Sequence, residues 1–243
     1  RQLHCLPTIT SVTDDEQNTF MMLSNDATHE PCMLQMPDYT PEQKVDNSAY
    51  ADQLANGYVV DGRKLKMENE RQVTHYQSNM AAMLQLGRWF DYLRENGVYD
   101  NTKIIIVSDH GRNIRQMDEA IYHLINDEEF DSEYFRALLM VKDFNATGFT
   151  SSDEFMTQAD TPTLAFGGLI DDPVNPFTGK VINNSEKTAH DQYIFESHIW
   201  DVGENNGNVF RPGNWFALRP GDSWNESNWR LVTFNSVLPE EAK

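Results

Sequence analysis

The chain has 243 residues, of which 39% are hydrophobic, so it is long enough for one large domain or two small ones. Its formal net charge of −19 argues against nucleic acid and anionic membrane surfaces as partners of the chain itself. No apolar run approaches the roughly 18 residues of a membrane-spanning helix. The chain opens at Arg1 without a signal peptide, so we expect a processed or excised piece of a longer protein.

The two cysteines, Cys5 and Cys32, leave the redox compartment open. They could form one disulfide in an oxidising compartment, or they could remain buried thiols. Because no C-x-x-C pair occurs, a zinc site built from thiolates is disfavoured. Residues 1–17 are predicted to be irregular.

The first apolar stretch is Thr19-Phe20-Met21-Met22-Leu23, which is typical of a short buried strand. It ends in a polar loop that contains His29. A histidine directly after a strand end can face a ligand cleft, although a solvated loop residue is the default interpretation. Three prolines, Pro31, Pro37 and Pro41, then predict an extended connection over residues 31–48.

Two helices are predicted next, a short one over residues 49–58 and the longest of the chain over residues 68–96. The apolar side chains of the long helix recur at spacings of three, four or seven, which traces one face. These side chains are Val73, Tyr76, Met80, Met83, Phe90 and Leu93. Asn96-Gly97 provides a C-terminal stop. Such a stripe is far more often core than a cofactor site.

The run Ile104-Ile105-Ile106-Val107 predicts a buried strand of a parallel sheet, because both of its faces are apolar. Ser108-Asp109-His110-Gly111 follows directly. Ligands of open α/β sheets bind outside the carboxyl ends of strands, and a carboxylate beside an imidazole suits a divalent metal. Asp109 and His110 are therefore candidate metal ligands. The alternative is a turn in which Asp109 caps the next segment.

The rest of the chain continues the alternation of elements and then changes character. Residues 127–133 form an acidic run, and such a run is usually a solvated loop. Calcium binding is the alternative, but the ligand spacing of an EF-hand is absent. Residues 135–141 predict a third buried strand, and residues 155–169 predict a helix. From residue 170 onward the chain is predicted to be loop-rich. Its tryptophans fit either a carbohydrate or partner platform or a packed subdomain; they are Trp200, Trp215, Trp224 and Trp229.

Four segments in order resemble the sulfatase branch of the alkaline phosphatase superfamily, and within it most closely the lipoteichoic acid synthases and phosphoethanolamine transferases. The resemblance covers about residues 18–170. Its segments are the strand and loop of residues 20–31, the helix leading into Gly97-Val98-Tyr99-Asp100, the run from Asp100 to Gly111, and residues 135–142 together with Ala159-Asp160-Thr161-Pro162-Thr163-Leu164.

The resemblance implies a three-layer αβα fold with a mostly parallel sheet, alkaline phosphatase-like but partial, plus a loop-rich C-terminal region. Residues 1–170 would form the C-terminal part of a sulfatase-like catalytic domain, with residues 171–243 packed on it as an extension. In this family the nucleophile and the first metal-binding acid lie upstream of the segment that matches Phe20. We therefore expect the nucleophile outside this chain, and expect the chain alone to bind metal weakly and to be inactive.

The implied function is a metal-dependent transferase or hydrolase of phosphate or sulfate esters that acts on envelope lipid or glycan, with phosphoglycerol or phosphoethanolamine transfer favoured. Asp109 and His110 would hold a divalent ion, either zinc or manganese, with calcium or magnesium as further options. His29, Arg112 and His123 would bind the anionic phosphate or sulfate ester. For Arg112 a structural ion pair is an equal alternative.

The same resemblance places the protein at the extracellular or periplasmic face of the bacterial cell membrane, with membrane contact only through an N-terminal part outside this chain. The alternative function is a catalytically inactive sulfatase-like binding or scaffolding module. An unrelated doubly wound hydrolase would account for Asp-His-Gly but not for the other three segments. A serine hydrolase is disfavoured because no G-x-S-x-G motif occurs.

Overall fold

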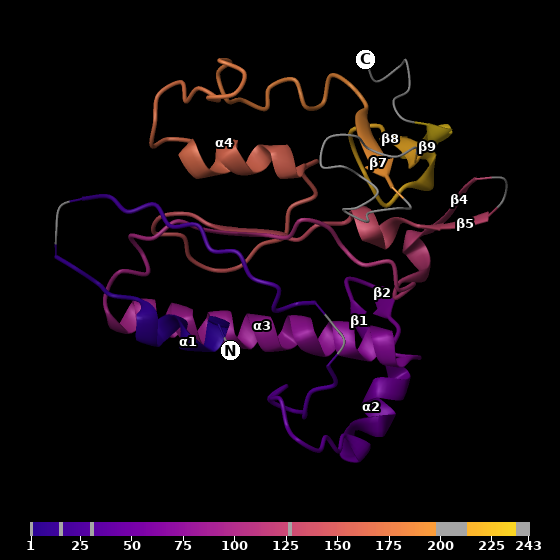
Figure 1. Cartoon of the computed structure of the whole chain (residues 1–243), viewed down its shortest axis with the longest axis horizontal. Coiled ribbons are helices and arrows are strands. Elements are labelled where there is room, and N and C mark those ends of the chain that lie inside the picture. Colours follow the sequence, from indigo (N-terminus) through magenta and orange to yellow (C-terminus); the bar gives the residue numbers. More distant parts are fainter. Residues whose placement is uncertain (1, 15–16, 30–31, 126–127, 198–212, 237–243) are drawn as a thin grey trace, which may run out of the picture. The chain divides into compact units, whose positions relative to one another are not determined.

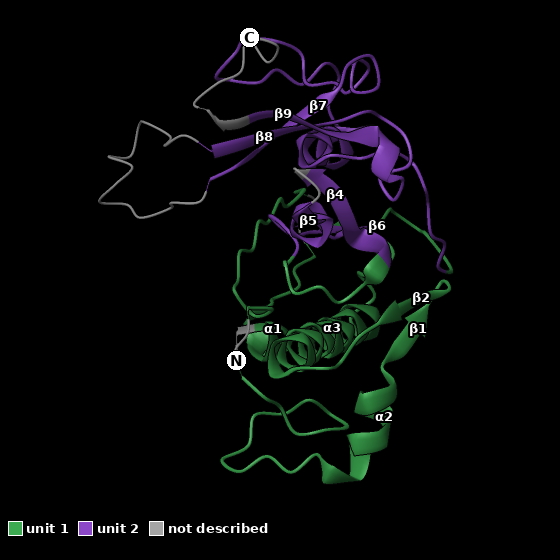
Figure 2. Cartoon of the chain, turned by 90° about the vertical axis from the view of Figure 1, so that its right-hand side faces the viewer, with its two compact units in different colours: residues 1–104, 112–118, 141–148 green, residues 105–111, 119–140, 149–243 purple. Residues whose placement is uncertain are grey.

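The structure is a computed structural model that describes residues 2–14, 17–29, 32–125, 128–197 and 213–236 (Figure 1). The chain divides into two compact units (Figure 2). Unit 1 contains residues 1–104, 112–118 and 141–148, and unit 2 contains residues 105–111, 119–140 and 149–243. The domain boundary predicted after residue 170 stays a prediction.

Unit 1 is mainly helical. Its elements are α1 (Gln2–Ile9), α2 (Ala51–Asn56), the antiparallel hairpin of β1 (Tyr58–Val60) and β2 (Arg63–Leu65), and α3 (Glu70–Glu95). A short 3₁₀ helix, Ser48–Tyr50, leads into α2, so the predicted short helix is confirmed.

Helix α3 confirms the predicted long helix almost to its ends. Its first turn is capped by Asn69, whose side-chain oxygen accepts the backbone N–H of Gln72 at 3.1 Å. At the other end Asn96 is the C-cap, and Gly97 follows with a φ of 71°. A left-handed residue after the last turn is the conformation that favours glycine, which is why the helix ends there.

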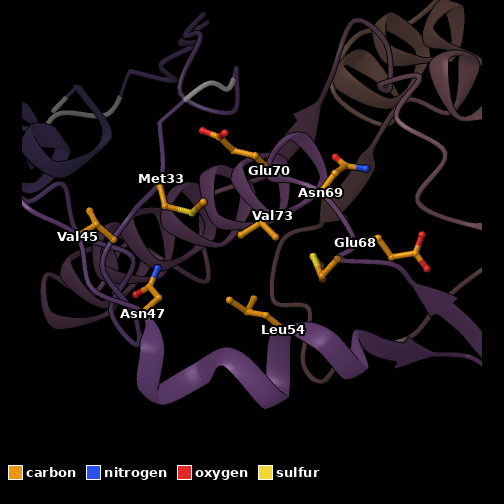
Figure 3. Close-up of a pocket in the computed structure, with 9 residues that line it drawn as sticks. Met33, Val45, Asn47, Leu54, Glu68, Asn69, Glu70 and Val73 are labelled. Atoms are coloured by element: carbon orange, nitrogen blue, oxygen red, sulfur yellow. The ribbon is translucent and has the colours of Figure 1, made fainter.

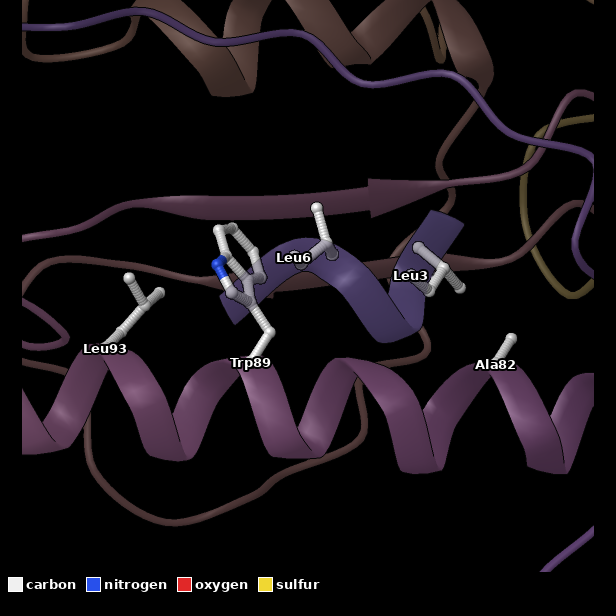
Figure 4. Close-up of a cluster of buried hydrophobic side chains, with 5 residues drawn as sticks. All are labelled: Leu3, Leu6, Ala82, Trp89 and Leu93. Carbon is white, nitrogen blue, oxygen red and sulfur yellow. The ribbon is translucent and has the colours of Figure 1, made fainter. Parts of the chain in front are cut away.

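Helix α1 packs along α3 and forms the core of unit 1 (Figure 4). Leu3 and Leu6 of α1 meet three buried side chains of α3, namely Ala82, Trp89 and Leu93. The Trp89 indole N–H also donates to Thr10 Oγ1 at 3.0 Å, directly after α1. The prediction that residues 1–17 are irregular was therefore wrong for residues 2–9, because tertiary packing stabilises a helix that contains Pro7.

The predicted strand at residues 19–23 is not formed. Within the described part of the chain no strand pairs with this segment, and its side chains are exposed, Phe20 at 73% and Met22 at 84%. A short apolar run becomes a strand only when a neighbour supplies its hydrogen bonds. The extended connection predicted for residues 31–48 agrees with the described residues, whose only β-bridge before Ser48 joins Gln35 and Thr40.

Unit 2 is built mainly from small sheets. Strand β3 (Ile104–Val107) pairs with β6 (Leu139–Lys142), and each of these two strands is shared between the units. Strands β4 (Ile121–Ile125) and β5 (Glu128–Asp131) form an antiparallel hairpin. The remaining elements are α4 (Thr161–Phe166) and the antiparallel sheet of β7 (Gln192–Glu196), β8 (Gly213–Leu218) and β9 (Trp229–Ser236).

These elements confirm a mixed helix and strand fold. The described sheets have two or three strands each, so the three-layer arrangement around a parallel sheet stays a prediction. Strand β3 lies where it was predicted, but it is only partly buried, with Val107 42% exposed. No helix of the described residues combines the length and the apolar character needed to cross a membrane.

Three predictions for the second half were wrong in detail. The strand predicted over residues 135–141 begins only at Leu139, after the 3₁₀ helix Ser132–Phe135. The helix predicted over residues 155–169 is reduced to a 3₁₀ turn, Gln158–Asp160, followed by α4. The acidic run includes β5, and its last residue, Glu133, is only 5% exposed.

The tail is more ordered than its composition predicted. Its antiparallel sheet shares an aromatic core with the β4–β5 hairpin. The buried members of this core are Tyr122, Phe130, Phe216, Leu218 and Trp229. Three of the tail tryptophans therefore have packing roles. Trp229 lies in this core, the Trp215 ring centroid lies 4.9 Å from that of Phe195, and the Arg136 guanidinium lies 3.6 Å from the Trp224 ring centroid. Trp200 lies outside the described residues.

Candidate functional site

The candidate site is the loop Ser108–Gly111 that follows β3. Its backbone is tied to the segment before β6 by three hydrogen bonds. Ser108 N–H donates to the Leu138 carbonyl at 3.1 Å, and the Leu138 N–H donates back to Ser108 Oγ at 2.8 Å. The Gly111 N–H donates to the Tyr134 carbonyl at 2.8 Å. The loop is therefore held on both sides of Asp109 and His110.

Gly111 is required by the closeness of this contact. A Cβ atom at this position would lie 2.0 Å from the Glu133 carbonyl oxygen and 2.8 Å from that of Arg136. Both neighbours are backbone atoms and cannot swing aside. The glycine allows the loop to lie directly against the segment that precedes β6.

The His110 ring is oriented by the backbone carbonyl of Gly111. Its Nδ1 lies 2.6 Å from the Gly111 carbonyl oxygen, and the ring centroid lies 4.8 Å from that of Tyr134. Because a carbonyl oxygen only accepts, we assign the proton of the neutral ring to Nδ1. Nε2 then carries the lone pair. Histidine ligands of metals are commonly oriented by a hydrogen bond of this kind.

The Asp109 carboxylate lies beside that nitrogen. Its Oδ1 accepts the His110 backbone N–H at 3.0 Å, while Oδ2 lies 3.6 Å from His110 Nε2. Two ligands that share a tetrahedral zinc ion at about 2.0–2.2 Å lie roughly 3.4 Å apart. The Asp109 side chain is 87% exposed, so it is accessible to a ligand. This pair of donor atoms fits a shared divalent ion.

The pair does not form a complete site by itself. Among the described residues there is no group of three or more histidine, cysteine, aspartate or glutamate side chains placed to hold a metal. Since a metal ion usually takes at least three protein ligands, Asp109 and His110 would supply part of a coordination shell.

The other predicted site residues occupy separate positions. His123 lies in β4 of unit 2, where its backbone N–H donates to Glu226 Oε1 at 2.6 Å. His29 and Arg112 belong to unit 1: His29 is exposed in a loop, and Arg112 directly follows Gly111. Among the predicted site residues that the structure describes, Asp109 and His110 are the pair whose side chains lie close together. The substrate-binding roles of His29, Arg112 and His123 stay predictions.

A residue that no sequence pattern singles out contacts the loop from a distant part of the chain. The Gln158 side-chain amide donates to the carbonyl oxygens of Ser108, at 2.8 Å, and of Asp109. Gln158 opens the 3₁₀ turn before α4. No spacing or residue pattern links it to Asp109, which lies 49 positions earlier.

The same turn ends at Asp160, a carboxylate that is only 1% exposed. Asp160 accepts the Thr157 N–H and the Asn184 amide, each at 2.7 Å, and lies 3.6 Å from Lys187 Nζ. Burial by itself would raise the pKa of Asp160. The bonds from Thr157 and Asn184 and the charge of Lys187 nevertheless hold this pKa below its ordinary value of 3.8.

A pocket of about 580 Å³ lies away from this loop, in unit 1 (Figure 3). It opens between α2, the N-terminal turns of α3 and the extended segment before α2. Its lining combines apolar side chains with two amides and two carboxylates. The apolar residues are Met33, Val45, Leu54, Met67 and Val73, and the polar ones are Asn47, Glu68, Asn69 and Glu70. None of the predicted site residues lines it.

Two comparisons with known proteins found matches to this chain. The chain is 41% identical over 58 residues to the multifunctional alkaline phosphatase superfamily protein PehA of Trinickia caryophylli, a match that covers 24% of this chain and 10% of that protein. No solved structure matches the chain. The sulfatase family matches residues 6–164, well over half of the chain, including the loop Ser108–Gly111. The predicted superfamily is thus confirmed: the chain belongs to the sulfatase family.

Proposed function

We propose that the protein is a metal-dependent hydrolase or transferase of phosphate or sulfate esters in which Asp109 and His110 supply two ligands of a divalent ion. Membership of the sulfatase family supports anionic esters as the substrate class. The observation that carries the metal role is the 3.6 Å distance between Asp109 Oδ2 and His110 Nε2.

Asp109 and His110 would have different roles at this site. A bound zinc or manganese ion would supply positive charge to the anionic ester and lower the pKa of a coordinated nucleophile. The Asp109 carboxylate is the anionic ligand. His110 offers the lone pair on Nε2 while Nδ1–H is engaged with the Gly111 carbonyl, so the ring is oriented before the ion arrives.

Four further elements of the proposal rest on the resemblance to lipoteichoic acid synthases and phosphoethanolamine transferases. The substrate is an envelope lipid or glycan, with phosphoglycerol or phosphoethanolamine as the transferred group. His29, Arg112 and His123 bind the anionic group. The protein acts at the extracellular or periplasmic face of the bacterial cell membrane. Its catalytic domain has a three-layer αβα fold.

The test measures metal binding and turnover together. Calorimetric titration of this chain with zinc or manganese should show weak binding that is lost in Asp109→Ala and in His110→Ala, because two ligands hold an ion loosely. In the whole protein as its gene encodes it, with the metal supplied, nitrophenyl phosphate or sulfate should be hydrolysed. Either substitution should then lower kcat/KM by about 100-fold or more.

His190→Ala is the matched control, since His190 is an exposed histidine of the same unit. It should change neither metal binding nor turnover. Metal binding or turnover that is unchanged in the Asp109→Ala/His110→Ala double variant would overturn the proposal. Metal binding without turnover of either ester would instead support the inactive binding module.

A further inference from the structure

Gln158, in the turn before α4, contacts the candidate site from a distant part of the chain. Its amide group donates two hydrogen bonds, to the carbonyl oxygens of Ser108 and Asp109. These carbonyls belong to the two peptide groups that flank the Asp109 Cα atom. On the basis of the function proposed above, we propose that Gln158 is a positioning residue that holds Asp109 and His110 in the orientation that binds the metal.

The geometry explains why a side-chain amide suits this role. Both protons of one NH₂ group can be used at once, so a single side chain restrains two successive peptide groups. Rotation of either peptide group would turn the Asp109 carboxylate away from His110 Nε2. The segment before β6 holds Ser108 and Gly111 through their N–H groups and the serine hydroxyl. Gln158 restrains the carbonyl side of the same loop.

Gln158 is itself held by a rigid support. The 3₁₀ turn Gln158–Asp160 closes on the Asp160 carboxylate, which accepts the Thr157 N–H at 2.7 Å. Asn184 and Lys187 contact the other oxygen of that buried carboxylate. The orientation of Asp109 thus depends on a chain of contacts that starts in residues 184–187, beyond the part of the chain that matches the family.

The chain offers a matched control for a substitution of Gln158. The Gln192 amide also donates to two backbone carbonyls of unit 2, those of Lys187 at 2.9 Å and His190 at 3.4 Å. Its bond to Lys187 is to the backbone carbonyl, whereas the contact of Lys187 with Asp160 is made by the side-chain ammonium. Gln158→Leu and Gln192→Leu therefore remove the same type of bonds with a similar change in side-chain volume. A purely structural role predicts the same outcome for both variants.

The first measurement needs no metal. Hydrogen exchange at the Gly111 amide, which is bonded to the Tyr134 carbonyl, reports opening of the loop. Since one hydrogen bond contributes a factor of about five, Gln158→Leu should accelerate this exchange about tenfold or more. Gln192→Leu should leave it unchanged. Unchanged exchange in Gln158→Leu, or equal acceleration in Gln192→Leu, would overturn the inference.

The second measurement is the zinc dissociation constant of the same variants, with thermal midpoints recorded alongside. Loss of a group that orients a metal ligand typically weakens binding by about 10–100-fold. That loss is expected in Gln158→Leu and not in Gln192→Leu, at similar thermal midpoints. Equal zinc affinity in Gln158→Leu and the unsubstituted chain overturns the positioning role. Zinc binding that does not respond to Asp109→Ala overturns the proposed function instead, and the metal-free exchange rates separate the two failures.

Discussion

Gly111 shows how much of the candidate site depends on a single missing methyl group. Gly111→Ala should lower the free energy of unfolding by about 2 kcal/mol or more, because the new Cβ would meet two backbone oxygens that cannot move aside. Urea unfolding measures the change. Gly87→Ala is the control, since Gly87 lies within α3 with open space around it and should stabilise the protein by about 0.5–1 kcal/mol. An unchanged stability of Gly111→Ala would contradict the packing of the loop against residues 133–136.

Asp160 gives a prediction with a defined pH dependence. Its pKa is lowered in the folded state, so the unfolded chain binds more protons and this carboxyl stabilises the fold above its ordinary pKa of 3.8. Asp160→Asn should therefore cost about 2 kcal/mol at neutral pH. The difference from the unsubstituted protein should shrink as the pH falls below 3.8 and disappear once the folded-state carboxyl is protonated.

Denaturant unfolding at a series of pH values tests this dependence. Asp153→Asn replaces an exposed carboxylate of the same unit and should leave the stability close to that of the unsubstituted protein. A stability difference for Asp160→Asn that stays constant from neutral to strongly acidic pH would show that the charge of Asp160 is not what matters.

At the same residue scale, Asp109 and His110 can be predicted as candidate metal ligands from the sequence, because an acid and an imidazole directly follow a recognisable strand. Gln158 could not be found in the same way. Its side-chain amide donates to backbone carbonyls, one of which lies 49 positions earlier in the chain. Every residue has a backbone carbonyl, so the residue types give no sign of such a contact. Contacts of this kind become visible only when the chain is folded.

At the scale of elements, α1 and α3 provide a direct test of packing. Leu6 of α1 is 5% exposed against α3, whereas Ile9 of the same helix is 69% exposed. Leu6→Ala should lower the free energy of unfolding by about 2–5 kcal/mol through lost burial and a residual cavity. Ile9→Ala should change it by less than about 0.5 kcal/mol. Similar losses for the two variants, measured in urea, would contradict the docking of α1 on α3.

The same two helices show what a sequence pattern can and cannot predict. Helix α3 was predictable because it has its own cap, its own stop and a length of 26 residues in which apolar side chains recur at helical spacings. Helix α1 has 8 residues with a proline inside, and it depends on Trp89 and Leu93 for its burial. The run at residues 19–23 had the composition of a strand, but no strand among the described residues supplies its hydrogen bonds.

At the scale of the whole molecule, the tail is part of the folding of unit 2. A chain that ends at residue 170 would lose the sheet that shares the aromatic core with β4 and β5, and would leave Asp160 without Asn184 and Lys187. We expect such a truncated chain to lose the cooperative unfolding of unit 2 while α1 and α3 stay protected. Hydrogen exchange followed by mass spectrometry distinguishes the two units, and full protection of residues 121–135 in the truncated chain would contradict this expectation.

The contacts of Asp160 also constrain how the tail can be exchanged between relatives. A chimera that receives a foreign tail keeps a carboxylate that is 1% exposed and needs both a hydrogen-bond donor and a positive charge. A replacement segment must therefore supply an amide and a cation at the positions of Asn184 and Lys187. Otherwise Asp160 must be replaced by an uncharged residue. Compatibility between residues 1–170 and a foreign tail would then depend on these three polar side chains as well as on the tail side chains that complete the aromatic core of unit 2.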